Sequence, residues 1–303
     1  MHDHDQRFKT LIREFFAEFL QLFFAKWAAR FDCTQIEWLD KEVFPDAPQG
    51  SRSVLDLVAK LPAREKILDG DAEAESWLAL VHIEIESPDK VAPLRPRMFR
   101  YYVHLRDRYK LPVLPIGLYL KVGLDGIGID VYEEHFWELE AVRFQYLYVG
   151  LPGLKAVEYI DGENWLGVAL TVLMQIPKGQ IAVMGMEALR RLSEAPLSDQ
   201  KRYLLVECVQ AYLPPMDEFQ KSEVEKLMVT ERYSGVRAMN KTWFEEGIEK
   251  ERREMLQEVM EDRFGPLPSA IAERLEKMSL DELMAVRKAI RHAKSLSDLG
   301  FDK

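Results

Sequence analysis

Cysteine is scarce in this sequence, which contains only Cys33 and Cys208 among its 303 residues. The two lie far apart and neither belongs to a C-x-x-C pair, which argues against a disulfide framework and against a structural zinc site. This cysteine usage is typical of a protein kept in a reducing compartment, so we expect a cytoplasmic location.

Long apolar runs are also missing. The most apolar stretch, residues 15–29, is interrupted by Glu18, Gln21 and Lys26. A membrane span needs about 20 consecutive apolar residues, and a signal peptide needs an unbroken apolar centre. The sequence therefore predicts neither a signal peptide nor a membrane partner.

A surplus of basic residues is absent as well: 41 Lys and Arg stand against 51 Asp and Glu, for a formal net charge of −10. Phosphate affinity comes largely from Lys and Arg that displace counterions. A uniformly basic surface for nucleic acid is therefore excluded, and any contact with DNA must be local.

Two common signatures of catalysis are missing. The segment 123–128 contains glycines but neither a P-loop lysine nor Rossmann spacing, and we interpret it as a turn. No Ser/His/Asp signature surrounds a nucleophile elbow.

The hydrophobic residues, 48% of the chain, follow the periods of both helices and strands. Apolar residues at three- and four-residue intervals predict one long core helix over 7–31. Composition predicts a helix over 95–108 and strands over 53–61, 76–86, 111–120 and 144–149. This order predicts an α/β protein with a mixed sheet covered by helices.

We predict two domains, 1–243 and 244–303. The first contains the α/β core over 4–150 and a mainly helical extension over 151–243. The tail is dense in Glu, Lys and Arg, turns at 265–268 and carries a capping box at 279–282. We interpret this tail as a small helical module.

Carboxylates lie on both strands of a predicted hairpin. Alternate side chains of a strand share a face, so His82, Glu84 and Glu86 point one way, and Asp56 and Lys60 share a face on the preceding strand. A register that sets Asp56 beside Glu84 places two ligands for one Mg²⁺ or Mn²⁺. The alternative is a half-exposed strand whose carboxylates face solvent.

Short motifs along the chain form a recognisable series. In order, they are His4-Asp5-x-x-Phe8-Lys9, Asp56-Leu-Val, His82-Ile-Glu84-Ile-Glu86, Arg97-Met-Phe-x-Tyr101 and the Leu-Pro-Val-Leu-Pro-Ile run ending at 116. This series resembles the recombination-promoting nuclease / putative transposase family of the PD-(D/E)XK superfamily. The resemblance covers residues 4 to about 120, and more loosely to about 240. The tail around 262–268 resembles a helical domain of unknown function often attached to that family.

The resemblance implies a restriction-endonuclease-like mixed sheet and a metal-dependent DNA endonuclease linked to mobile elements or recombination. In the family pattern the metal ligands correspond to Asp56 and Glu84. The third catalytic position, Lys in the superfamily and often Gln in this family, is Glu86 here, and a carboxylate donates no hydrogen bond to water unless protonated. Either Glu86 acts as a further ligand or a base, or a nearby cation, Lys60 or Arg97, takes the electrostatic role.

A basic window follows the hairpin. It contains one acid, Asp107, and the cations Lys90, Arg95, Arg97, Arg100, Arg106, Arg108 and Lys110. We expect Arg97 and Arg100 to face the DNA backbone, with Tyr101 able to bond to phosphate or stack on a base. The alternative is a solvated helix face.

Two functional hypotheses follow. The first is a Mg²⁺-dependent DNA endonuclease with Asp56, Glu84 and Glu86 as its catalytic residues. The second is a nuclease-fold protein with little or no catalysis that acts as a DNA-binding or assembly module. In that case the C-terminal helices join copies of the chain into a homo-oligomer, although their charge pattern fits a solvated helix equally well.

Overall fold

The computed structural model describes residues 2–39, 43–45, 52–54, 56–69, 74–86 and 94–239, with single positions between 256 and 299. The chain forms two compact units, Met1–Tyr233 and Ser234–Lys303. The predicted domain boundary at residue 243, the turns at 265–268 and the capping box at 279–282 lie outside the described residues.

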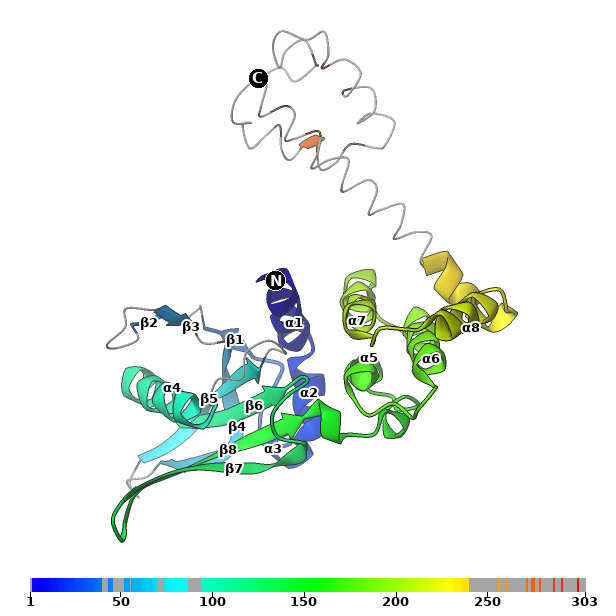
Figure 1. Cartoon of the computed structure of the whole chain (residues 1–303). Coiled ribbons are helices and arrows are strands. Elements are labelled where there is room, and N and C mark those ends of the chain that lie inside the picture. The colour runs from blue at the N-terminus through cyan, green and yellow to red at the C-terminus, as the bar shows by residue number, and fades with distance from the viewer. Residues whose placement is uncertain are drawn as a thin grey trace. The chain divides into compact units, whose positions relative to one another are not determined.

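The first unit contains a six-stranded mixed sheet in the order β1-β4-β5-β6-β8-β7 (Figure 1). Strand β5 runs antiparallel to β4 and parallel to β6, which is parallel to β8, while β7 is antiparallel to β8. The carboxyl ends of β5, β6 and β8 therefore meet at one edge. The strands are β1 (Glu37–Trp38), β4 (Leu57–Asp69), β5 (Ala74–Glu86), β6 (Val113–Tyr119), β7 (Gly126–Phe136) and β8 (Leu139–Gly150). An α/β fold with a mixed sheet flanked by helices is confirmed.

The apolar N-terminal stretch forms three helices, α1 (His2–Glu14), α2 (Phe16–Phe23) and α3 (Ala25–Ala28), so the single long helix predicted there is wrong. Phe15 and Phe24 interrupt it with non-helical backbone angles. Both side chains are buried, so the apolar stripe continues across the breaks. Periodicity identifies the buried residues but does not reveal where the helix is interrupted.

The predicted hairpin is present and longer than expected. Strand β4 begins at Leu57 and continues to Asp69, whereas the prediction covered 53–61. Its second half is interrupted by a register shift between Pro62 and Ile67, an irregularity that weakens the strand pattern in the sequence. A separate two-stranded sheet precedes it, formed by β2 (Val43–Pro45) and β3 (Arg52–Val54).

Helix α4 (Leu94–Tyr109) connects the parallel strands β5 and β6 and covers one face of the sheet. Tyr101 and Leu105 pack on Val58 and Leu80, which anchors the helix over the hairpin. The predicted helix over 95–108 and the strand over 111–120 are confirmed within a few residues.

Strands β7 and β8 form a long hairpin, of which the sequence predicted only 144–149. Gly126 begins β7, so the interpretation of 123–128 as a turn is correct only for its first residues. Strand β7 lies at the edge of the sheet, and its apolar residues Ile127, Ile129 and Phe136 are exposed. The alternation of Ile127, Ile129 and Val131 is a strand signal that the interpretation of 123–128 as a turn left unused.

The remainder of the first unit is helical, as predicted. Helix α5 packs against α6 and α7, and α7 also packs against α1. The elements are η1 (Leu151–Gly153), η2 (Ala156–Glu158), α5 (Trp165–Leu170), η3 (Thr171–Leu173), α6 (Ile181–Ser193), α7 (Asp199–Tyr212), α8 (Glu218–Met228) and η4 (Glu231–Tyr233).

The described positions of the second unit form a small apolar core of its own. Its buried members are Leu256, Met260, Leu275, Val286 and Ile290. Across the described part of both units, no helix is long and apolar enough to cross a bilayer.

Candidate active site

Asp56 and Glu84 lie side by side at the edge of the sheet where β5 ends. Leu57 pairs with Ile83, and this register sets the preceding residue, Asp56, beside Glu84. The backbone N–H of Ile85 donates a 2.7 Å hydrogen bond to Asp56 Oδ2. The structure thus brings the two predicted metal ligands together.

The proximity of these carboxylates changes the acidity of Asp56. Burial and the charge of Glu84 raise the pKa of Asp56 to about 7, although Lys9 and the hydrogen bond from Ile85 oppose the shift. The pKa of a carboxyl group rises this far when its charged form is poorly solvated and is repelled by a neighbouring negative charge. Additional positive charge would relieve that repulsion.

The face of β5 that carries His82, Glu84 and Glu86 is buried, with exposed fractions of 0%, 4% and 6%. The alternative of a solvent-facing strand is therefore wrong. Helix α4 covers this face, and the ring of Tyr101 meets that of His82 edge-on at 5.6 Å. His82 Nε2 lies 3.1 Å from Glu84 Oε2, which fixes one oxygen of that carboxylate.

Arg97 contacts both buried glutamates. Its Nε lies 3.2 Å from Glu84 Oε1, and its Nη2 pairs with Glu86 Oε1. Arg97 therefore faces the sheet, with 21% of its side chain exposed, and its position against a DNA backbone stays a prediction. Of the two cations expected near Glu86, the structure places Arg97 there and not Lys60, whose Nζ lies 2.9 Å from Glu37 Oε2.

Lys9 is a member of the site that sequence reasoning assigned no role. Its Nζ lies 2.6 Å from Asp56 Oδ1, and both side chains are largely buried, with exposed fractions of 17% and 10%. Its only signal in the sequence was its place in the Phe8-Lys9 motif, because nothing local links helix α1 to Asp56.

The predicted DNA-facing patch on α4 is smaller than expected. Tyr101 is 4% exposed and is therefore unavailable to DNA. Arg95 pairs with Asp130, whereas Arg100 and Arg108 lie on the exposed side of the helix. Lys90 lies outside the described residues.

A second polar cluster lies near the same end of the sheet as the carboxylate site. Asp130 of β7 accepts two hydrogen bonds of 2.9 Å from Arg95, through Nε and Nη2, and one of 2.5 Å from the Tyr146 hydroxyl. Tyr119 extends the cluster, with its hydroxyl 3.4 Å from that of Tyr146. Burial by itself would raise the pKa of Asp130, but the bonds from Arg95 and Tyr146 lower it. Burial and the bond to Asp130 raise the pKa of Tyr146, which remains a neutral donor.

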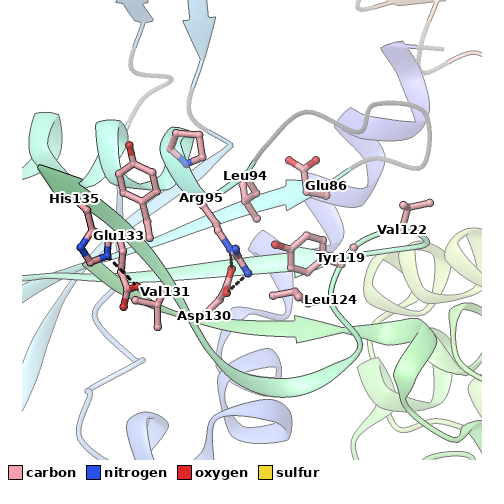
Figure 2. A pocket seen from close by; sticks show the side chains of 13 residues that line it. Glu86, Leu94, Arg95, Tyr119, Val122, Leu124, Asp130, Val131, Glu133 and His135 are labelled. Carbon is pink, nitrogen blue, oxygen red and sulfur yellow. Dashed lines mark hydrogen bonds and ion pairs between the residues drawn. The ribbon is translucent and has the colours of Figure 1, made fainter. Parts of the chain in front are cut away.

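This cluster lines a cavity of about 680 Å³, which we call the Arg95 pocket. Figure 2 shows Glu86 and Val122 toward one end, His135 at the other and the Arg95–Asp130 pair between them. Glu86 pairs with Tyr119 across β5 and β6, so the pocket adjoins the carboxylate site. This pocket could not be predicted from the sequence, because its residues come from β5, α4, β6, the segment after β6, and β7.

The carboxylate site offers two side chains, Asp56 and Glu84, as possible ligands of a divalent cation. No three His, Cys, Asp or Glu side chains in the described part of the chain are grouped so that they could hold a metal ion together. Mg²⁺ commonly binds through one or two carboxylates and keeps several waters. Asp56 and Glu84 are two such carboxylates, and their four oxygens are contacted by Lys9, the Ile85 N–H, Arg97 and His82.

Comparisons with protein families, with curated proteins and with solved structures found no match for this chain.

Proposed function

We propose that this protein is a metal-dependent DNA endonuclease of the PD-(D/E)XK type, which hydrolyses phosphodiester bonds at Asp56 and Glu84. One observation supports it above the others. Two largely buried carboxylates lie beside each other, Asp56 just before β4 and Glu84 on β5, and the pKa of Asp56 is raised to about 7 by burial and by the charge of Glu84. Functional sites concentrate such perturbed groups.

The arrangement of the elements agrees with this proposal. N-terminal helices are followed by the antiparallel pair β4 and β5, the crossover helix α4 and the parallel strand β6. This is the order in which the motifs resembling the recombination-promoting nuclease family occur along the sequence. The family's link to mobile elements and recombination is part of the same proposal.

Asp56 and Glu84 would hold Mg²⁺ or Mn²⁺, which when bound acidifies a coordinated water and neutralises charge on the phosphate. The chain's own residues prepare this site. His82 and Arg97 hold opposite oxygens of Glu84, so its carboxylate has a fixed orientation.

Under this proposal, cations from outside the strand compensate for the Glu86 departure from the family pattern. Glu86 is paired with Arg97, which brings one cation from α4. Lys9 brings a second cation to Asp56 from α1. We propose that Lys9, whose ammonium has three donors, supplies the hydrogen bond and charge that Glu86 lacks.

Cleavage of supercoiled plasmid with Mg²⁺ tests the proposal. We expect the intact chain to nick the plasmid, EDTA to abolish nicking, and Glu84→Gln and Glu84→Ala to reduce it by at least about 100-fold. Glu140→Gln, at an exposed carboxylate of β8, is the matched control and should retain wild-type nicking. Equal nicking by Glu84→Gln and Glu140→Gln, or none by the wild type, contradicts the proposal.

A second candidate is a nuclease-fold protein that binds DNA or assembles without cutting. The observation that favours it is Arg97, which already pairs with both Glu84 and Glu86. This function predicts that DNA retards the protein in native gels while no metal supports cleavage. Assembly through the C-terminal helices predicts a homo-oligomer by light scattering that becomes a monomer when residues 244–303 are removed.

A further inference from the structure

The Arg95 pocket has the size and lining of a ligand site. Its volume of about 680 Å³ falls within the roughly 300–1,000 Å³ usual for such sites. Leu94, Pro96 and Leu124 supply apolar walls, while Tyr119 and Tyr132 supply aromatic rings. Tyr132 is held against the ring of Phe99 at 5.4 Å, so its position is set by the fold.

The charges of the pocket do not favour an anionic ligand. Arg95 is neutralised by its two bonds to Asp130. The other acids in the lining are Glu86, paired with Arg97, and Glu133, paired with the exposed Arg143, and both arginines lie outside the lining. These pairs leave the lining without a net positive charge to attract a phosphate, whereas a neutral ring with amino groups can share the carboxylate oxygens as acceptors.

Arg95 also offers a flat surface. Its side chain is 55% exposed, although Asp130 fixes the guanidinium through two bonds. A planar guanidinium held in this way is a stacking partner for a nucleobase, as are tyrosine rings.

We infer that the Arg95 pocket accepts one unpaired nucleobase of a DNA whose backbone lies at Asp56 and Glu84. The inference rests on the proposed function and adds a substrate class to it: DNA with an unpaired nucleotide beside the cut, as at a bulge or a frayed end. Glu86 connects the two places, because it lines the pocket and shares Arg97 with Glu84. An unpaired base enters such a pocket at little cost, whereas a paired base must first be unstacked.

The first test varies only the DNA. Two otherwise identical duplexes carry either one unpaired adenine or one unpaired abasic nucleotide, and binding to the full chain is measured by fluorescence anisotropy with Ca²⁺ in place of Mg²⁺. We expect the adenine duplex to bind at least about 5-fold more tightly, the lower limit for loss of one stacked base. Equal affinities overturn the inference without any variant protein.

The second test varies the pocket. Tyr132→Leu removes a stacking face and is expected to abolish the preference for the unpaired adenine, while Tyr132→Phe keeps the ring and should preserve it. Tyr203→Leu, at a tyrosine on α7 that is 44% exposed and outside the lining, is the matched control. If Tyr132→Leu and Tyr203→Leu both retain the preference, the pocket is not its source and the inference fails.

The two proposals fail in different ways. If no DNA is cut with Mg²⁺ but the adenine preference in Ca²⁺ persists and depends on Tyr132, the endonuclease proposal fails while the base pocket stands. If both duplexes are bound equally and cut at equal rates, and Glu84→Gln stops the cutting, the endonuclease proposal stands and the base pocket is overturned.

Discussion

The ammonium of Lys9 lies 2.6 Å from Asp56 Oδ1 and joins the first helix to the residue that precedes β4. This contact gives α1 a place in the site, since it brings a cation to a carboxylate that Glu84 already crowds. A lysine in such a position both offsets the negative charge of Asp56 and donates a hydrogen bond.

Lys9→Met is expected to reduce Mg²⁺-dependent plasmid nicking by about 100-fold, because one donor at the reacting groups is lost. Lys9→Arg keeps the charge and should restore part of the rate. Lys60→Met is the control, since the Lys60 ammonium pairs with the exposed Glu37 away from the site. Wild-type nicking by Lys9→Met, or an equal loss in Lys60→Met, contradicts this role for Lys9.

Arg97→Met is expected to lower the free energy of unfolding by about 3–5 kcal/mol, because Glu84 and Glu86 are left buried without their shared cation. Urea denaturation at pH 7.5 measures the change. Adding Glu86→Gln should recover part of the loss, since one of the two buried charges is then removed.

The control for Arg97 is Arg143→Met. Arg143 pairs with Glu133 and Glu140 at the surface, and such pairs contribute about 0–1 kcal/mol. Unfolding of Arg97→Met at the same urea concentration as Arg143→Met would contradict the buried arrangement.

The hairpin carries the part of the site that could be predicted from the sequence. Alternation along 76–86 placed His82, Glu84 and Glu86 on one face, and that assignment agrees with the paired register of β4 and β5. Whether this face of β5 is exposed to solvent could not be predicted, because the residues that bury it belong to α4, a separate element. Tyr101 and Arg97 were interpreted as facing outward for the same reason.

The rest of the site depends on contacts between distant segments. Lys9 reaches Asp56 from another element, and Asp130 meets Arg95 across β7 and α4. Periodicity and spacing describe neighbours along one element and contain no information on such pairs. Strand β7 was missed because the glycines of 123–128 were interpreted as a turn, and the Arg95 pocket was missed with it.

Lys110 follows the last residue of α4 with a φ of 54°, the left-handed region that favours glycine. Its N–H donates to the Arg106 carbonyl at 3.0 Å, so the backbone is committed to this conformation. We expect Lys110→Gly to raise the free energy of unfolding by about 0.5–1 kcal/mol by relieving this strain. The pair of Lys110 with Asp107 is fully at the surface and its loss should cost little.

Thermal denaturation of Lys110→Gly checks this expectation. Lys121→Gly is the comparison, because Lys121 is exposed and does not have a positive φ. The glycine there should give no gain in stability. A lower melting temperature for Lys110→Gly than for the wild type would show that the left-handed turn is not strained.

The pKa of Asp56 predicts how stability depends on pH. Because its pKa rises from 3.8 to about 7 on folding, the native protein retains a proton between these values that the unfolded chain has lost. Its contribution to stability is therefore greatest below pH 4, decreases as the pH rises toward 7 and is constant above that. Asp56→Asn should remove this dependence, so in EDTA it gains stability over the wild type at pH 8, on the order of a few kcal/mol, and much less, about 1 kcal/mol, at pH 4.5.

The change in stability caused by Asp130→Asn should depend on pH with the opposite sign. The pKa of Asp130 is lowered by its bonds with Arg95 and Tyr146, against the effect of burial. Its stabilisation is present above the ordinary aspartate pKa and is lost as the pH falls. Asp130→Asn should therefore cost more stability at pH 8 than at about pH 3, below the ordinary value of 3.8. Urea denaturation of the three proteins from about pH 3 to pH 8 measures both slopes. If the difference between Asp56→Asn and the wild type is the same at pH 4.5 and pH 8, Asp56 is not the crowded carboxyl that the proposed metal site requires.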